Sequence, residues 1–283
     1  MFPAPHFINN FRYTVLKIIM IKITAVSYLN TKPLLYGLIK SGLSKEIDLQ
    51  LDIPSECARK LASAEVDMGL VPVAVIPELT NPHIISDYCI GTVGSVKTVC
   101  IFSHCPIAEM THLYLDYHSR TSVELVQVLL REHWGLAPAL IPAKPGFEEK
   151  IAGTTGAVII GDRAIGMEDK CEYIYDLGEA WMAYSGLPFV FAAWVSNKPM
   201  DERFIKKFNA ALKLGVEDIP NLMYILPTPV QGFDLKKYFT ENISYELDAA
   251  KRKGLDLFLQ LMKETKTSNQ SSVHHQSTVT IHH

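Results

Sequence analysis

The chain has 283 residues, of which 48% are hydrophobic, and its formal net charge at pH 7 is −3. This length and apolar content suffice for one large domain or two lobes with buried cores, and they argue against extensive disorder. The mild charge argues against nucleic-acid or acidic-lipid surfaces, which bind through basic stripes, so a small molecule is the expected partner.

The two ends of the chain differ from the rest. Arg12 precedes the apolar stretch near the N-terminus, Lys17 and Lys22 interrupt it, and no small-residue cleavage site follows. This pattern is not typical of an export signal, and no apolar run is long enough to span a membrane. We predict that residues 1–19 form an extension before the fold and that the polar residues 268–283 form a disordered tail.

Residues 20–102 alternate between strand and helix patterns. Strands are predicted at 21–28, 47–54 and 66–75, with helices at 33–42 and 55–65 between them. A strand-helix-strand-helix-strand order is typical of a parallel sheet with helices on its faces.

A second round of α/β patterns follows. The predicted strands are 95–103, 112–117, 156–162, 171–177 and 188–197, and the predicted helices are 122–134, 201–220 and 244–262. We therefore predict an α/β fold of two lobes joined by two crossing strands. Lobe 1 takes residues 20–102 and 194–267, and lobe 2 takes residues 103–193. In such an arrangement the ligand binds in the cleft between the lobes, beyond the carboxyl ends of the parallel strands.

The first strand-to-helix corner is rich in hydrogen-bonding side chains. It contains Ser27, Tyr28, Asn30 and Thr31. Either Thr31 or Asn30 can cap the helix that begins at Lys32–Pro33, where proline is well tolerated. Free amides at a helix N-terminus attract carboxylates or phosphates, so this corner is a candidate anion site, although its side chains could also serve only as caps.

A second corner repeats the arrangement on the predicted lobe 2. It contains Ser119, Arg120, Thr121 and Ser122. The spacing of Thr121 and Glu124 matches a capping box, but Arg120 and the extra hydroxyl groups exceed what a cap requires. Arg120 could bind a carboxylate through a bidentate fork. Two anion-binding corners that face each other across a cleft indicate a small ligand with two carboxylates.

Other polar groups are weaker candidates. Ser95 and Thr98 lie at the entry to a predicted crossing strand, and Asp162 either caps the next helix or faces the cleft. No glycine-rich nucleotide motif, metal-ligand spacing or serine-hydrolase elbow is present, so no metal or cofactor is expected. The five cysteines form no C-x-x-C pair and are predicted to be reduced and mostly buried.

Several ordered motifs resemble a known family. The stretches VSYLNTKPL, LVPVAVIPEL, LDYHSRTSVELVQVLL and DLGEAWMAYSGLPFVFAAWV are similar to the MqnA/MqnD family of the futalosine route to menaquinone, over about Lys22 to Leu261. The resemblance implies a periplasmic-binding-protein type II fold used as a cytoplasmic enzyme. It also implies a dicarboxylate substrate, chorismate, which would lose water to give 3-[(1-carboxyvinyl)oxy]benzoate without a redox cofactor.

The resemblance also implies roles for two residues. Asn30 matches the family's motif asparagine at the substrate, and Thr98 aligns with a small hydroxyl residue that is serine in the family. The residues assigned to the two corners include no His or Glu that could act as a general base. We therefore hypothesise that the enolpyruvyl carboxylate of the substrate removes the ring proton, with Asp162 as the best protein alternative.

Three other functions remain open from the sequence. They are the sister 1,4-dihydroxy-6-naphthoate synthase of the same fold, a solute-binding protein, and the sensor domain of a regulator. A solute-binding protein should carry an export signal, and a regulator is normally joined to a DNA-binding helix-turn-helix.

Overall fold

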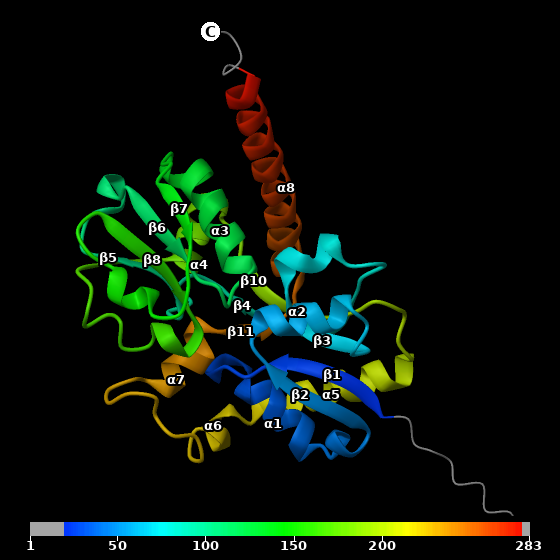
Figure 1. The fold of residues 1–283 in the computed structure, drawn as a ribbon. Helices are drawn as coiled ribbons and strands as arrows, with labels where there is room; N and C mark the ends of the chain where they lie inside the picture. The colour runs from blue at the N-terminus through cyan, green and yellow to red at the C-terminus, as the bar shows by residue number, and fades with distance from the viewer. Residues whose placement is uncertain (1–19, 279–283) are drawn as a thin grey trace, which may run out of the picture.

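The structure is a computed structural model that describes the backbone of residues 20–278 and the side chains of residues 20–267. The predicted extension of residues 1–19 lies outside the described residues. Within the described residues, two sheets form two lobes that lie side by side (Figure 1).

The sheet of lobe 1 has six strands in the order β11-β4-β10-β3-β1-β2. Their bounds are Ile21–Val26 for β1, Ile47–Asp52 for β2, Met68–Pro72 for β3, His83–Thr92 for β4, Phe189–Ser196 for β10 and Ser244–Glu246 for β11. The predicted parallel unit is present, because β1 pairs in parallel with both β2 and β3. By contrast, β10 runs antiparallel between β3 and β4, and β11 runs antiparallel to β4.

Three helices cover this sheet. They are α1 (Lys32–Lys40), α2 (Pro54–Ala62) and α5 (Glu202–Glu217). α1 and α5 pack together on one face, and α2 lies on the other (Figure 1). Two short helices follow α5 in the chain, α6 (Ile219–Leu222) and α7 (Leu235–Lys237).

The sheet of lobe 2 has five strands in the order β7-β6-β8-β5-β9. The strands are Val99–Ser103 for β5, His112–Leu115 for β6, Ala139–Pro142 for β7, Thr155–Ile160 for β8 and Tyr173–Asp176 for β9. Its helices are α3 (Thr121–Leu129) and α4 (Leu177–Ser185).

Both exchanges between lobes occur earlier in the chain than predicted. The chain enters lobe 2 between β4 and β5, not near Ser103, and it is back in lobe 1 when β10 begins at Phe189, not near Ala193. Both β5 and β10 are buried along their whole length. A continuous apolar run fits a strand in either sheet, so the sequence pattern alone does not decide its partner.

The last helix, α8, spans Ala249–Thr278. It begins later than predicted, because the Asp248 carboxylate accepts the Lys251 N–H at 2.8 Å and the preceding residues pair as β11. α8 also ends later than predicted. The prediction of a disordered tail over residues 268–283 is therefore wrong for residues 268–278, which are helical. Residues 279–283 lie outside the described residues. Once a helix is nucleated, each added residue gains a hydrogen bond without a new nucleation cost.

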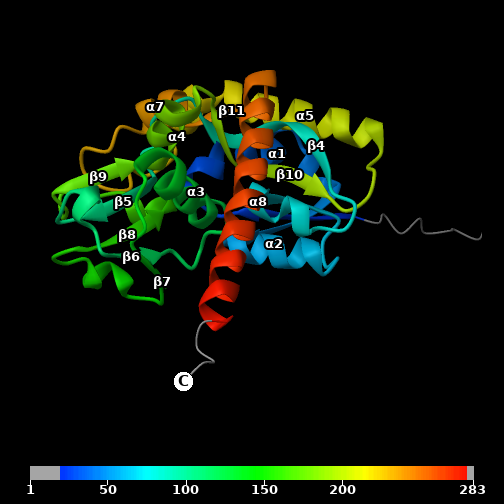
Figure 2. The ribbon, with the colours of Figure 1, turned by 90° about the horizontal axis from the view of Figure 1, so that it is seen from above.

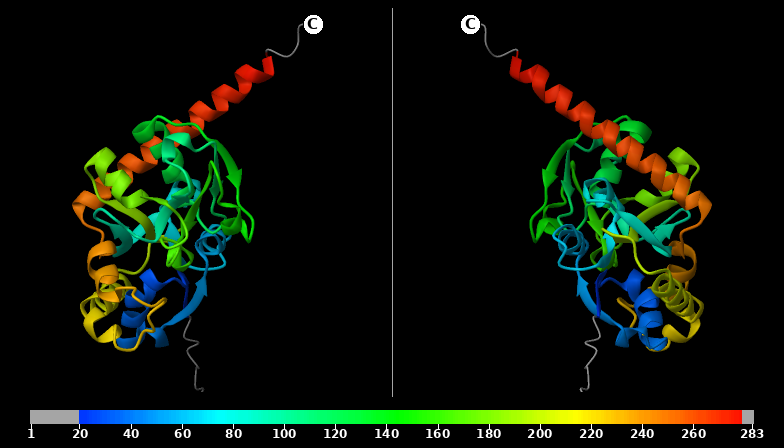
Figure 3. Two further views of the ribbon diagram at one scale, coloured as in Figure 1. Left: turned by 90° about the vertical axis from the view of Figure 1, so that its left-hand side faces the viewer. Right: turned by 90° about the vertical axis from the view of Figure 1, so that its right-hand side faces the viewer.

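α8 crosses the molecule and contacts both lobes. It packs against α3 of lobe 2 and β10 of lobe 1, and Lys266 reaches Glu124 on α3 at 3.1 Å (Figure 2). Its C-terminal end projects beyond the body of the protein (Figure 3). The five cysteines form no disulfide and four of them are buried, as predicted.

The contact of α1 with α5 depends on two glycines, Gly37 and Gly215. A Cβ atom at Gly215 would overlap the backbone oxygen of Pro33, and one at Gly37 would overlap that of Ala211. We expect Gly215→Ala to lower the free energy of unfolding by about 2 kcal/mol, because the helices must move apart. Urea denaturation measures this, with Lys213→Ala on the exposed face of α5 as the control. An unchanged midpoint for Gly215→Ala would show that the helices can separate at no cost.

Candidate active site

A small cavity lies between the lobes at the carboxyl end of β1. Residues of both lobes line it, and its volume is about 50 Å³. Six polar side chains contribute to its wall, all of them predicted site residues: Tyr28, Asn30, Thr31, Ser119, Thr121 and Ser122. The other lining residues are apolar or glycine, so no charged side chain lines this cavity among the residues that the structure describes.

The first corner holds Asn30 in a fixed position. Residues Leu29–Thr31 form a 3-10 turn between β1 and α1, and the predicted side-chain cap of α1 by Thr31 or Asn30 is wrong. The backbone N–H of Thr31 instead donates to the carbonyl of Tyr28 at 3.1 Å. The Thr31 hydroxyl donates to Asn30 Oδ1 at 3.1 Å, and the buried Tyr245 hydroxyl donates to the Asn30 carbonyl at 2.9 Å. Within the described residues, Asn30 Nδ2 has no protein acceptor, so it is a donor available to a ligand.

The second corner brings two serines to the cavity. The predicted capping box is wrong, because Ser119 Oγ accepts the Ser122 N–H at 2.9 Å and Thr121 is the first residue of α3. The Thr121 hydroxyl donates to the Phe191 carbonyl at 2.9 Å and accepts the Ala74 N–H at 3.3 Å. Thr121 therefore joins lobe 2 to lobe 1.

Arg120 does not lie at the cavity. It is exposed at the position before α3, and its side chain caps nothing. Ser27 is likewise exposed after β1, outside the cavity lining. The structure thus brings together the hydroxyl and amide groups of the two corners, but not the cation that the sequence analysis placed with them.

Two contacts close the lobes over the cavity. The Asp162 carboxylate of lobe 2 accepts the Leu29 N–H of lobe 1 at 2.9 Å. Asp162 therefore does not cap the turn that follows it in the chain, and it does not line the cavity. Loss of hydration raises the pKa of its carboxyl group. The Tyr28 hydroxyl lies 2.8 Å from Nδ1 of His118. The sequence analysis missed His118, although it stands in the same stretch as the second corner.

A buried ion pair lies beneath the second corner and was also missed. Asp116 is 1% exposed and pairs with Arg163. The Asp116 carboxylate also accepts the N–H groups of His118 at 2.9 Å and Ile160 at 3.0 Å. These contacts fix the segment between β6 and α3 on the end of β8.

Thr98 lies behind the cavity wall. Its side chain is fully buried, and its hydroxyl lies 3.0 Å from the Tyr238 hydroxyl. Val96 and Val99 on either side of it line the cavity, whereas Thr98 itself does not. Thr98 is therefore placed to set the position of this wall.

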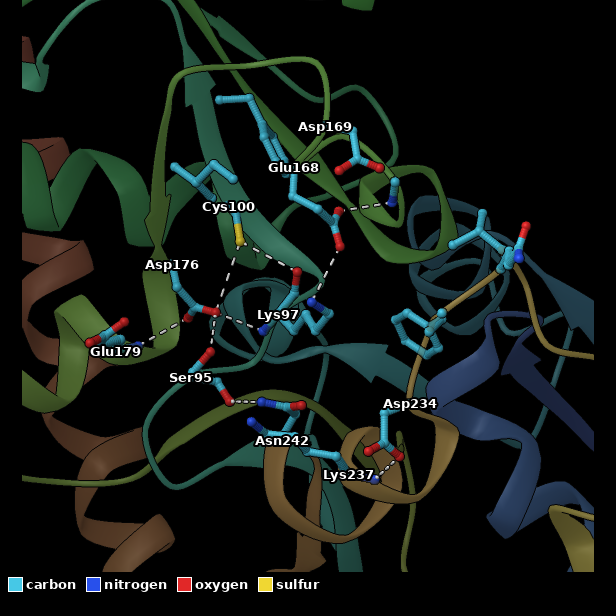
Figure 4. A pocket seen from close by; sticks show the side chains of 17 residues that line it. Ser95, Lys97, Cys100, Glu168, Asp169, Asp176, Glu179, Asp234, Lys237 and Asn242 are labelled. Carbon is cyan, nitrogen blue, oxygen red and sulfur yellow. Dashed lines mark hydrogen bonds and ion pairs between the residues drawn. The ribbon is translucent and has the colours of Figure 1, made fainter.

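The opposite side of the same connecting segment faces a larger hollow of about 550 Å³ (Figure 4). There the Asp176 carboxylate accepts the Ser95 hydroxyl at 2.8 Å and the N–H groups of Val96 at 3.1 Å and Lys97 at 2.6 Å. It also accepts the first free N–H groups of α4. Ser95 thus contributes to a structural contact that ties the first connection between the lobes to the end of β9 and the start of α4 in lobe 2.

The structure shows no group of three or more metal-ligating side chains among its described residues. Within the same part of the chain, no helix is long and apolar enough to cross a membrane.

Two α/β lobes, two exchanges of the chain between them and a cavity between the lobes are the features of the periplasmic-binding-protein fold. A protein of Archaeoglobus fulgidus has a TM-score of 0.63 at 14% identity, covering 89% of this chain and 98% of that one. A Candida albicans protein described as having the generic periplasmic binding protein fold has a TM-score of 0.56 at 11% identity, covering 88% and 95%. For the aliphatic sulphonate binding protein of Escherichia coli the TM-score is 0.55 at 11% identity, covering 89% and 93%.

The chain belongs to the family of menaquinone biosynthesis proteins, which it matches over residues 21–264. The chorismate dehydratase of Thermus thermophilus is 24% identical over 234 residues, which cover 74% of this chain and 84% of that protein. The chorismate dehydratase of Campylobacter jejuni is 27% identical over 168 residues, which cover 58% and 74%. The family and the fold predicted from the sequence are confirmed.

Proposed function

We propose that this protein is a chorismate dehydratase that converts chorismate to 3-[(1-carboxyvinyl)oxy]benzoate and water. The family and the two dehydratases among its relatives support this function. The structural observation that carries it is the interlobe cavity, whose polar groups are neutral donors in an otherwise apolar wall. A cytoplasmic location fits a biosynthetic function of this kind.

For this reaction the enzyme must orient the substrate and allow a proton to be removed, and it need not form a covalent bond to the substrate. The ring hydroxyl leaves, the neighbouring ring C–H loses its proton, and the ring becomes aromatic. Asn30 Nδ2 and the hydroxyl groups of Ser119 and Ser122 are the donors that would hold the substrate for these steps. The cavity of about 50 Å³ is far smaller than ligand pockets of roughly 300–1,000 Å³, so substrate enters when the lobes separate.

The enolpyruvyl carboxylate of the substrate is the proposed base. Transfer from water into a cavity without a cationic side chain raises the pKa of a carboxylate and makes it a better proton acceptor. An arginine paired to the same carboxylate would have the opposite effect. The absence of charge among the described lining residues therefore favours substrate assistance.

The first test is incubation of the purified protein with chorismate, followed by chromatography and mass spectrometry. We expect an aromatic product that is lighter by one water. Unchanged chorismate that still raises the melting temperature would indicate a binding module instead. Neither turnover nor stabilisation would contradict the proposal and direct the search to the substrate of the sister 1,4-dihydroxy-6-naphthoate synthase.

Substitution of Asp162 tests the identity of the base. In Asp162→Asn the amide oxygen still accepts the Leu29 N–H, so we expect kcat to stay within about tenfold of the wild-type value. The measurement is steady-state kinetics together with the dissociation constant for chorismate. Loss of turnover with unchanged binding would assign the base to Asp162 and overturn substrate assistance.

Substitution of Arg120 tests whether the substrate is bound by a cation. Because Arg120 lies outside the cavity, we expect Arg120→Gln to change kcat/KM by less than about threefold. A rise in KM of a hundredfold would show that Arg120 turns inward onto a substrate carboxylate during closure. The half-buried Arg131, which pairs with Glu132, supplies the control Arg131→Gln for loss of one positive charge in lobe 2.

A further inference from the structure

Tyr28 reaches across the cleft from lobe 1 to lobe 2. It follows β1, its half-buried side chain lines the cavity, and its hydroxyl lies 2.8 Å from His118 Nδ1. The two rings are nearly parallel, with an interplanar angle of 14° and centroids 6.5 Å apart. This pair therefore forms part of the boundary between the cavity and the outside.

The Tyr28 ring packs against Gly161 of lobe 2. A Cβ atom at Gly161 would lie 2.6 Å from that ring, and the residue has a φ angle of +63° that favours glycine. The backbone next to Tyr28 is held as well, through the Leu29 N–H and Asp162. The closed position of Tyr28 is thus specified by three residues of the opposite lobe.

His118 is itself held in place by lobe 2. Its backbone N–H donates to the buried Asp116 carboxylate, and the Tyr117 ring meets its imidazole edge-on at 4.4 Å between centroids. The imidazole therefore has a defined position before Tyr28 reaches it. A hydrogen-bond partner that is already oriented loses little conformational entropy when the bond forms.

We propose that His118 is a positioning residue. It accepts a hydrogen bond from the Tyr28 hydroxyl and so holds Tyr28 in place as part of the cavity wall when the lobes are closed. The inference rests on the proposed function, because it assigns a role in enclosing that substrate. His118 does not line the cavity, so it acts through Tyr28. The Tyr28–His118 bond forms only when the lobes close, and it contributes to substrate affinity more than to the chemical step.

The charges around the pair agree with this direction of the hydrogen bond. The titratable groups that face His118 are Tyr28, Tyr117, Asp116, Glu148 and Arg163. Burial, reinforced by the charge of Arg163, lowers the pKa of His118 and favours the neutral imidazole, whose Nε2–H tautomer offers Nδ1 as an acceptor. Burial raises the pKa of Tyr28, so the phenol keeps its proton.

The same shifts give the expected pH dependence. Burial lowers the pKa of His118 in this structure, and we expect Tyr28 to add to that burial on closure. Closure would then bind fewer protons than the open state and be favoured as the pH rises through that pKa. Protonation removes the acceptor at Nδ1 and places a second positive charge beside Arg163. We expect the KM for chorismate to rise as the pH falls and His118 becomes protonated.

The test compares Tyr28→Phe, His118→Ala and the double variant, with His118→Asn as a rescue that keeps a polar atom near the position of Nδ1. Loss of one net hydrogen bond predicts a rise in KM of about fivefold with little change in kcat. The double variant should match the single variants, because both remove the same bond. His118→Asn should restore most of the affinity and abolish the pH dependence of KM. Tyr117→Phe, which keeps its ring against His118, is the matched control.

A second measurement is independent of catalysis. Hydrogen exchange at the Leu29 amide should be faster in Tyr28→Phe and His118→Ala than in the wild type, with melting temperatures unchanged. Additive effects in the double variant, or unchanged exchange and KM, would overturn the proposal. If the wild-type protein does not convert chorismate, the proposed function fails, while the exchange rates still decide whether the pair holds the lobes closed.

Discussion

Asn30→Ala should lower kcat for chorismate dehydration by at least about a hundredfold, the effect seen when one preorganised donor is removed from an active site. Asn30 lines the cavity, its Nδ2 has no protein acceptor in the described structure, and its Oδ1 accepts the Thr31 hydroxyl. Its orientation is therefore set before substrate binds. Steady-state kinetics with chorismate, together with the melting temperature, checks the prediction.

Two further variants test the same position. Thr31→Val removes the hydroxyl that orients Asn30 Oδ1, and we expect a smaller loss of kcat than in Asn30→Ala. Asn221→Ala, which removes an exposed asparagine that bonds to Asp218, is the control. Turnover at the wild-type rate in Asn30→Ala would remove Asn30 from the site, even if chorismate dehydration itself were confirmed.

Arg163→Met should have the largest effect on stability, a loss of about 3–5 kcal/mol in the free energy of unfolding. It leaves the Asp116 carboxylate buried without its cation, although the N–H groups of His118 and Ile160 remain. The penalty arises because a carboxylate that is 1% exposed cannot recover its hydration in the folded state. Thermal and urea denaturation measure the loss.

A surface arginine serves as a control that separates the effect of burial on stability from the effect of losing a charge. Arg59 bonds to Glu56 and Glu65 on the surface of lobe 1, and exposed ion pairs contribute little to stability. Arg59→Met should therefore change the free energy of unfolding by less than about 1 kcal/mol. Equal losses for the two variants would show that the Asp116–Arg163 pair behaves as an exposed one.

The sequence predicted the features that depend on local periodicity. Alternating strand and helix patterns predicted the two α/β lobes, and six of the polar side chains named after β1 and around the start of α3 line the interlobe cavity. These features could be read from the sequence because each is encoded within about ten consecutive residues.

Features that depend on distant partners could not be predicted. Asp116 and Arg163 are separated by 47 positions, and nothing local shows that they form a buried pair. Similarly, Arg120 and Arg163 both follow a strand end, but only the tertiary structure shows that one is exposed and the other pairs with a buried carboxylate. The predicted caps failed because a backbone turn and Ser119 supply hydrogen bonds that the sequence pattern assigned to other groups.

The interleaved strand order has a consequence for folding during synthesis on the ribosome. All five strands of the second sheet come from the continuous stretch 99–176, whereas β10, at residues 189–196, separates β3 from β4 in the first sheet. The strands β3 and β4 therefore emerge with unpaired edges, which stay unpaired until β10 has been synthesised and inserts between them. We expect lobe 2 to reach its native strand pairing first, although the first strands of lobe 1 leave the ribosome earlier. We also expect nascent chains that stop before β10 to be the most prone to aggregation.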